Sequence, residues 1–77
     1  MKELVGFMAK AMVDNPQDVE VTEIAGGHTL VIELKVAKED MGKIIGKKGR
    51  NVQAMRTILN GASGKLKKKV VLEIVDQ

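Results

Sequence analysis

Alternating side chains between residues 29 and 36 constrain the fold more than any other part of the sequence. Aliphatic residues fall at every second position there: Leu30, Ile32, Leu34 and Val36. This spacing predicts a strand that buries one face. The chain has 77 residues and no cysteine, so no disulfide can reinforce its core, which at this size supplies only about 3–5 kcal/mol. We therefore expect a single domain, 1–77, in which helices cover the buried face of this strand.

Residue spacing elsewhere predicts three helices and two more strands. An amphipathic helix is expected where apolar residues recur at three- and four-residue intervals, and Pro16 prevents its continuation. Gly26-Gly27 is a two-residue hairpin signal before the strand at 29–36. The expected elements are a helix at about 2–13, strands at 19–24 and 29–36, helices at 38–45 and 49–60, a loop at 61–64 and a strand at 70–74.

The element order α-β-β-α-α-β is typical of an α+β fold. The hairpin makes the first two strands antiparallel. We expect the two-helix connection to return the third strand to the same sheet antiparallel to the second, with Val70, Leu72 and Ile74 facing inward. The predicted architecture is a mixed three-stranded sheet covered on one face by three helices.

Charge is divided unevenly along the chain. Residues 1–39 hold four lysines against seven acidic residues, a net of −3, whereas residues 40–77 hold nine Lys and Arg against three, a net of +6. This division favours a cationic face and a polyanionic partner, although lysines that only aid solubility explain it equally well. Phe7 is the only aromatic residue, which excludes the base-stacking platforms of RRM and OB folds. Nucleic-acid binding would have to use backbone contacts, cations and an aliphatic groove.

Two glycines bracket two lysines between the predicted second and third helices, in the segment Gly46-Lys47-Lys48-Gly49. Without a Cβ, each glycine permits a sharp turn and lets a ligand approach the main chain closely. The next helix begins here, and its unpaired N–H groups and dipole attract phosphate. Both lysines and Arg50 add positive charge at the same point. The alternative is a helix that ends at a glycine, followed by lysines that only aid solubility. A binding loop is favoured because both residues between the glycines are cations and because the segment lies between two helices.

The segment from Ile45 to Val52 resembles the Ile-Gly-x-x-Gly-x-x-Ile signature of the KH (K-homology) domain, with Val52 in place of the commoner Ile. The element order resembles the type II KH arrangement. The run from Gly42 to Thr57 resembles the small stand-alone KH proteins of bacteria, the KhpA family. This resemblance covers essentially the whole chain and implies a type II KH fold that binds single-stranded RNA, with the G-x-x-G loop clamping the backbone of about four nucleotides. It also implies a role as an RNA chaperone or post-transcriptional regulator.

The resemblance implies a set of RNA-binding residues around the loop, with Ile44 and Ile45 at the aliphatic positions of the motif. The expected set is Gly42, Lys43, Ile44, Ile45, Gly46, Lys47, Lys48, Gly49, Arg50 and Arg56. The resemblance further implies a homodimer, or a heterodimer with another KH-containing protein. Four aliphatic residues outside the predicted core are candidates for that contact: Ile58, Val31, Val71 and Val75.

Enzymatic function is not expected. A P-loop is excluded because Gly42 and Gly46 enclose only three residues and Lys48 stands where a hydroxyl would hold magnesium. His28 follows a turn and has no second histidine at ligand spacing, and Ser63 has no partner for nucleophilic catalysis. We therefore expect no catalytic site, no metal and no cofactor.

Several alternatives stay open at the level of sequence. The chain is either an RNA binder, a KH-shaped module that works chiefly by dimerising, or a binder of single-stranded DNA. The lysines at 65 and 67–69 either contact phosphate or only solvate a loop and protect an edge strand. No apolar run approaches the ~18 residues of a membrane span, and the first residues lack the apolar block of a signal peptide, so we expect a cytoplasmic protein without membrane contact.

Overall fold

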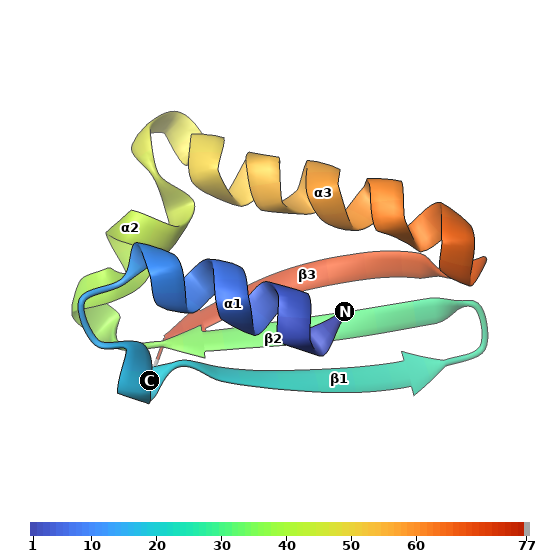
Figure 1. Cartoon of the computed structure of the whole chain (residues 1–77), viewed down its shortest axis with the longest axis horizontal. Coiled ribbons are helices and arrows are strands. Elements are labelled where there is room, and N and C mark those ends of the chain that lie inside the picture. Colours follow the sequence, from blue (N-terminus) through green and yellow to red (C-terminus); the bar gives the residue numbers. More distant parts are fainter. Residues whose placement is uncertain (77) are drawn as a thin grey trace.

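The computed structural model describes residues 1–76, apart from the side chain of Leu66. Figure 1 shows three long strands with the helices packed over them. In chain order the elements are α1 (Lys2–Met12), the 3-10 turn η1 (Pro16–Asp18), β1 (Glu20–Gly26), β2 (Thr29–Val36), the 3-10 turn η2 (Lys38–Asp40), α2 (Met41–Ile45), the 3-10 turn η3 (Lys47–Gly49), α3 (Arg50–Leu66) and β3 (Lys69–Asp76). The predicted α+β order of elements is confirmed.

The sheet has the order β1-β2-β3, so β2 is the central strand. β1 pairs with β2 antiparallel and β3 pairs with β2 parallel. The sheet is mixed, as predicted, but the expected antiparallel pairing of the third strand with the second is wrong. The reason is the length of α3, whose 17 residues rise about 25 Å and carry the chain back along β2. β3 therefore starts at the same end of the sheet as β2 and runs in the same direction (Figure 1).

Helix α3 is longer than the sequence predicts. The expected end at Asn60-Gly61 and the expected loop at 61–64 are both wrong, because the helix continues to Leu66. A Cβ at Gly61 or Gly64 would meet nothing within 4 Å, so each glycine costs only its propensity, about 1 kcal/mol relative to Ala. Leu59, 1% exposed, holds the helix in the core just before its predicted end, and Ala62 and Ser63 beyond it are half-buried. A shorter helix would not reach the end of the sheet where β3 begins. Tertiary packing therefore outweighs the local breaker signal.

The hairpin turn is displaced by one residue from the predicted Gly26-Gly27. Gly26 pairs with Thr29 as the last residue of β1, so the turn consists of Gly27 and His28. Gly27 has a φ of +57°, a left-handed conformation that favours glycine. Because Gly26 takes part in the strand, β1 extends two residues beyond the predicted end at residue 24.

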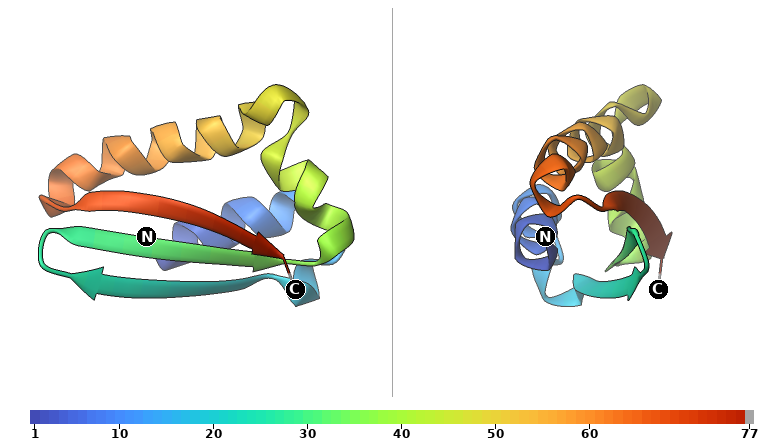
Figure 2. Two further views of the ribbon diagram at one scale, coloured as in Figure 1. Left: turned by 180° about the vertical axis from the view of Figure 1, so that it is seen from behind. Right: turned by 90° about the vertical axis from the view of Figure 1, so that its right-hand side faces the viewer.

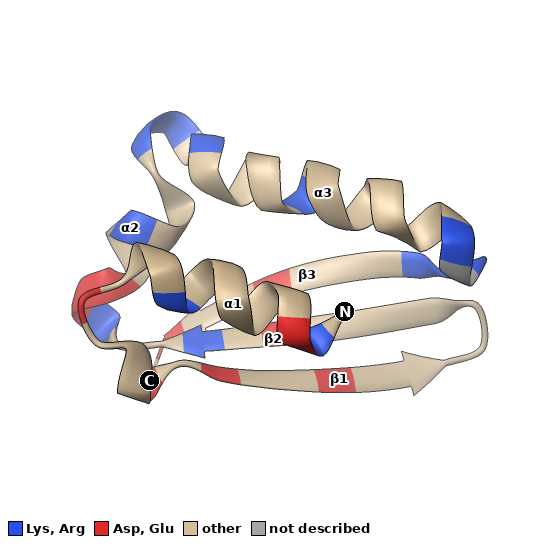
Figure 3. Ribbon diagram, in the orientation of Figure 1, with Lys and Arg blue, Asp and Glu red and all other residues tan. Residues whose placement is uncertain are grey.

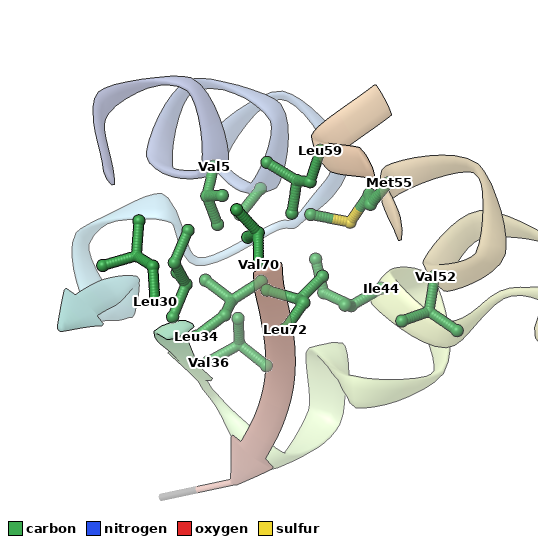
Figure 4. Close-up of a cluster of buried hydrophobic side chains, with 12 residues drawn as sticks. Val5, Leu30, Leu34, Val36, Ile44, Val52, Met55, Leu59, Val70 and Leu72 are labelled. Atoms are coloured by element: carbon green, nitrogen blue, oxygen red, sulfur yellow. The ribbon is translucent and has the colours of Figure 1, made fainter. Parts of the chain in front are cut away.

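The core lies between the sheet and the helices, which cover one face as predicted (Figure 2). Every second residue of β2 is buried, from Leu30 at 7% exposure to Ile32, Leu34 and Val36 at 0%. The other buried hydrophobic residues of this cluster, most of them labelled in Figure 4, are Val5, Ala9, Ile44, Val52, Met55, Leu59, Val70 and Leu72. On the uncovered face, the paired Val31 and Val71 are half-buried. The alternation in β2 therefore separates a buried from an open face, as the sequence predicts.

A buried carboxylate ties the loop after α1 to the start of α2. Asp40 is 0% exposed and accepts hydrogen bonds from the backbone N–H groups of Asp14 (3.2 Å) and Asn15 (3.1 Å) and from Asn15 Nδ2 (3.0 Å). Burial raises the pKa of Asp40, but the hydrogen bonds from Asn15 and Asp14 and the charge of Lys43 outweigh it, so the pKa lies below its ordinary value. The ionised carboxylate therefore stabilises the placement of α2.

Replacing Asp40 by Asn is expected to lower the free energy of unfolding by about 1–3 kcal/mol at neutral pH, because an amide NH₂ would then face buried N–H donors. The lowered pKa makes this stabilisation complete above the unfolded-chain value of about 3.9 and removes it as the pH falls through the folded value. Denaturant unfolding of both proteins across this range should show their difference shrinking below about pH 4. Glu73→Gln, at an exposed carboxylate on β3, serves as the control, and a difference that stays constant with pH would contradict the assignment.

Candidate nucleic-acid interface

The Gly46–Gly49 segment forms a tight turn between α2 and α3, at the upper left of Figure 1. The N–H of Gly46 donates to the Gly42 carbonyl (2.8 Å) at the end of α2, and the N–H of Gly49 donates to the Gly46 carbonyl (3.1 Å). Both loop glycines have left-handed φ values, +76° and +72°, and Lys48 between them has a φ of +58°. Such values are unfavourable for residues with a Cβ. The glycines of the motif are therefore required by the backbone itself, and Lys48 is held in a strained conformation.

Asn51, in the first turn of α3, braces this loop against α2. Its Nδ2 donates a hydrogen bond to the Lys43 carbonyl at 2.8 Å. Its side chain occupies the space beside Gly46, where a Cβ would lie 2.5 Å from Asn51 Cγ. The sequence analysis missed this residue because the partner carbonyl lies eight positions earlier, on the other side of the turn. Only the folded loop brings the two groups together.

The cations of the loop are exposed and form no ion pairs within residues 1–76. Lys47, Lys48 and Arg50 are all exposed, and within residues 1–76 none of them pairs with a carboxylate. Figure 3 shows this group of basic residues around the turn. No side chain caps the N-terminus of α3. The N–H of its first residue, Arg50, donates to the Lys47 carbonyl, but the positive end of the helix dipole lies in the same region and favours an anion there. The turn thus combines three cations with the positive end of a helix dipole.

The predicted site residues that lie on α2 differ from the loop cations, since none of them is both charged and unpaired. Lys43 forms an ion pair with Asp14 across the loop after α1, and this hydrogen bond raises the pKa of Lys43. Ile44 is fully buried in the core, whereas Ile45 is 38% exposed beside the turn. Gly42 lies one turn before Gly46 with open space where a Cβ would be. Of the aliphatic pair, only Ile45 is therefore open to a ligand, and RNA contact by any of the four stays a prediction.

Arg56 lies apart from the loop, in a groove between α3 and the edge strand β3. Its Nη2 donates to the Leu72 carbonyl at 3.2 Å. The groove has a volume of about 340 Å³ and is lined by Arg56, Leu59, Asn60, Lys69, Val70, Val71 and Leu72. Its floor is aliphatic and its rim is polar or cationic. This groove differs from the predicted one, because β3 supplies much of its wall and neither Ile44 nor Ile45 lines it. An aliphatic groove beside the turn stays a prediction.

Two features of residues 1–76 bear on other functions. Within this part of the chain no three His, Asp or Glu side chains come together as metal ligands. No helix in it combines the length and apolar character needed to cross a bilayer. His28, in the hairpin turn, is exposed.

Comparison with known proteins agrees with this geometry. Residues 2–74 match the family described as "KhpA/KhpB, KH domain". The chain belongs to the KhpA/KhpB family of KH domains. Its membership confirms the type II KH fold that the resemblance implied, and the G-x-x-G turn between α2 and α3 lies where that motif is expected.

Members of the KhpA/KhpB family from several bacteria resemble the chain over almost its full length. A protein of Caldanaerobacter subterraneus is 59% identical over 75 residues, which cover 97% of this chain and all of that protein. Proteins of Clostridium perfringens (53% over 75 residues) and Aquifex aeolicus (50% over 76 residues) are also similar, with 100% and 96% of their lengths covered. Each of these relatives is named RNA-binding protein KhpA. No solved structure gives a significant match.

Substitution of the two loop glycines is expected to have unequal effects on stability. Gly46→Ala must adopt a left-handed φ and also displace Asn51, whereas Gly49→Ala meets open space and carries only the φ penalty of about 1–2 kcal/mol. Gly46→Ala should therefore lower the free energy of unfolding by about 1–3 kcal/mol more than Gly49→Ala. Denaturant unfolding measures both.

A double-mutant cycle tests the steric origin of this difference. In an Asn51→Ala background, the added cost at Gly46 should become smaller, because the clashing side chain is gone. It should stay above that at Gly49, because Gly46 (φ 76°, ψ 172°) lies outside the αL region that Gly49 (φ 72°, ψ 15°) occupies. Equal costs at the two glycines in the parent protein would show that Asn51 does not hold the loop.

Proposed function

We propose that the chain binds single-stranded RNA by clamping its sugar–phosphate backbone at the Gly46–Gly49 turn and the N-terminus of α3. The observation that carries this proposal is the left-handed turn, in which Gly49 leaves open space at the main chain beside three unpaired cations. The relatives named as RNA-binding proteins support it. They are named for RNA binding and not for a reaction, and we assign no catalytic role to any residue.

The composition of the site indicates how the strand is held. Phosphate lies at the positive end of the α3 dipole, and Lys47, Lys48 and Arg50 neutralise the adjacent charges. Ile45, partly exposed beside the turn, offers an aliphatic surface for a base. Because Phe7 is the only aromatic residue, stacking contributes little, and the loop positions a strand without reading its bases. Such low sequence specificity suits an RNA chaperone or post-transcriptional regulator in the cytoplasm.

Reversing two loop charges tests the clamp. Lys47→Asp with Lys48→Asp should leave the free energy of unfolding within roughly ±0.5 kcal/mol, because both side chains are exposed. Affinity for single-stranded RNA should fall for all sequences together, since repulsive charges replace attractive ones beside phosphate. The matched control is Lys10→Asp with Lys38→Asp, the same charge change at exposed lysines outside the turn. Binding titrations and circular-dichroism melts report the two effects separately.

Three outcomes separate the candidate functions. Unchanged RNA binding in the loop variant, with normal melting, would contradict the clamp. Equal affinity for a DNA strand of the same sequence would show that the site does not use the 2′-hydroxyl. With three neutralised phosphates, the slope of log affinity against log salt on an oligonucleotide of about four nucleotides should be near −2, and a slope near zero would exclude phosphate contact.

We also propose that α1 and α3 together pair the chain with a second copy or with another KH-containing protein. A groove of about 320 Å³ between these helices is lined mainly by apolar residues: Phe7, Met8, Ala11, Met12, Asn51, Ala54, Met55 and Ile58. Phe7 is 75% exposed and Ile58 49% exposed, which is unusual for large apolar side chains that share one surface. The predicted contact residue Ile58 thus lies in this groove, whereas Val75 lies on the open face of the sheet.

The substitutions Ile58→Asp and Val75→Asp distinguish these two surfaces. If the helical groove forms the dimer, Ile58→Asp should give a monomer in sedimentation at high micromolar concentration, because the charge would be buried between protomers. Val75→Asp, at a residue 36% exposed, should leave the dimer intact. A parent protein that sediments only as a monomer would contradict pairing with itself, and the reverse pattern would assign the contact to the sheet.

A further inference from the structure

A groove of about 510 Å³ lies between α1 and the start of β1, away from the Gly46–Gly49 turn. One face of α1 lines it with Lys2, Gly6, Phe7 and Lys10, and Val19 and Val21 lie opposite them. In the end-on view of Figure 2, α1 lies on the β1 side of the sheet and α3 on the β3 side. The groove therefore has a helix on one side and an edge strand on the other.

The outer edge of β1 is open to a further strand. β1 pairs with β2 through seven consecutive residues without a bulge, and it is the edge strand of the sheet. An edge of this kind presents backbone N–H and C=O groups that an extended chain can pair with. Val21 pairs with the buried Leu34, so the side chain of Val21 lies on the face covered by the helices. Because side chains alternate along a strand, a chain added beside β1 would direct every second residue into the groove.

Gly6 keeps the floor of this groove low at a cost to the helix. Glycine is a poor helix former, and Gly6 lies in the interior of α1. A Cβ at this position would meet only Val21 Cγ2, at 3.7 Å, which is an ordinary contact. The packing of the chain would therefore accept an alanine here. The glycine instead leaves room beside Val21 for a side chain from outside.

Phe7 forms an apolar wall of the groove and is 75% exposed. It is the only aromatic residue in the chain. An aromatic ring left in water beside the half-buried Val19 and Val21 is typical of a surface that another chain covers. The groove thus offers an apolar contact next to free backbone groups.

The charges that remain unpaired at the groove are positive. The two acidic side chains on this side already have partners, because Glu3 pairs with the N-terminal amine (3.8 Å) and Glu23 accepts a hydrogen bond from the backbone N–H of Lys2 (2.7 Å). The side chains of Lys2 and Lys10 are exposed and pair with no carboxylate within residues 1–76. Charge complementarity therefore favours an acidic occupant.

We propose that the α1–β1 groove docks an extended acidic segment of a partner protein, which adds to the free edge of β1 and inserts apolar side chains between Phe7 and Val21. The free strand edge selects an extended polypeptide, the apolar walls select alternating aliphatic residues, and the two lysines select negative charge between them. This inference is independent of the proposed RNA clamp. A segment bound there would leave the Gly46–Gly49 turn accessible.

A simpler explanation assigns these features to other causes. Phe7 also lines the α1–α3 groove, so pairing through that groove would cover part of its ring, and lysines on a helix aid solubility. This explanation predicts no preference for an acidic segment and no contact with β1. It also leaves the glycine at position 6 without a reason.

A titration with a synthetic peptide tests the proposal. The probe is a capped peptide of about eight residues in which valine alternates with glutamate, a length that matches the seven residues of β1. The matched probe has lysine in place of glutamate. At millimolar concentration, the acidic peptide should shift the NMR signals of the backbone amides of residues 20–26 and of α1, and slow hydrogen exchange in β1. The signals of residues 46–58 should stay unchanged.

Two variants locate the contact. Lys2→Glu/Lys10→Glu should weaken binding of the acidic peptide roughly tenfold, because two attractive charges become repulsive, and should strengthen binding of the basic peptide. Gly6→Leu should abolish binding by filling the groove. Leucine favours the helix, and a circular-dichroism melt verifies that the variant folds. The controls are Ile58→Asp in the α1–α3 groove and Lys47→Asp/Lys48→Asp in the loop, both of which should bind the peptide as the parent does.

Four results would overturn the docking site. They are unchanged signals at residues 20–26 with the acidic peptide, equal affinity for the acidic and basic peptides, shifts confined to the α1–α3 groove, and a single-stranded RNA that shifts β1 as the peptide does. Failure of the RNA clamp is recognised separately, because Lys47→Asp/Lys48→Asp would then leave RNA affinity unchanged, whatever the peptide shows.

Discussion

The parallel pairing of β3 with β2 determines how the rest of the molecule is arranged. A parallel connection within one sheet must return the chain to the end at which the first strand began. Here α3 makes that return along the full length of the sheet. The helix consequently has the Gly46–Gly49 turn at one end and the start of β3 at the other, and its flank forms a groove with the edge strand. The loop cations and the lysines where α3 meets β3 owe their positions to this one connection.

The precision of the loop depends on how α2 is held. A helix of five residues cannot be stable alone. Three contacts with other parts of the chain hold α2 in place. Ile44 is buried in the core, Asp40 before the helix binds the backbone of residues 14 and 15, and Asn51 after the loop binds the Lys43 carbonyl. A turn ordered in advance loses less conformational entropy when it binds a strand, so on the proposed function these contacts favour affinity for RNA although they touch no ligand.

Some lysines form ion pairs within the fold, whereas others have no acidic partner in the described part of the chain. Lys43 pairs with Asp14, and Lys35 pairs with Glu20 on the open face of the sheet. The loop cations and those at the far end of α3 have no such partner within residues 1–76. The excess of positive charge in the second half of the chain is thus presented along one helix and its two ends. On the proposed function, affinity depends on these charges because the chain has one aromatic residue, and strong dependence on salt follows.

The sequence by itself determined the local features of this protein. The alternation at 30–36 predicted the central strand and its buried face, because side chains of a strand alternate strictly. The glycines at 46 and 49 predicted the turn, because left-handed backbone strongly favours residues without a Cβ. Tertiary structure decided what depends on distant partners. It set the direction of β3 and the continuation of α3 through Gly61 and Gly64, where packing outweighs a small local penalty. Tertiary structure also buried Ile44 in the core, paired Lys43 with Asp14 and placed Asn51 against Gly46. Such contacts join residues whose positions along the chain carry no sign of one another, so they arise only when the sheet and helices pack.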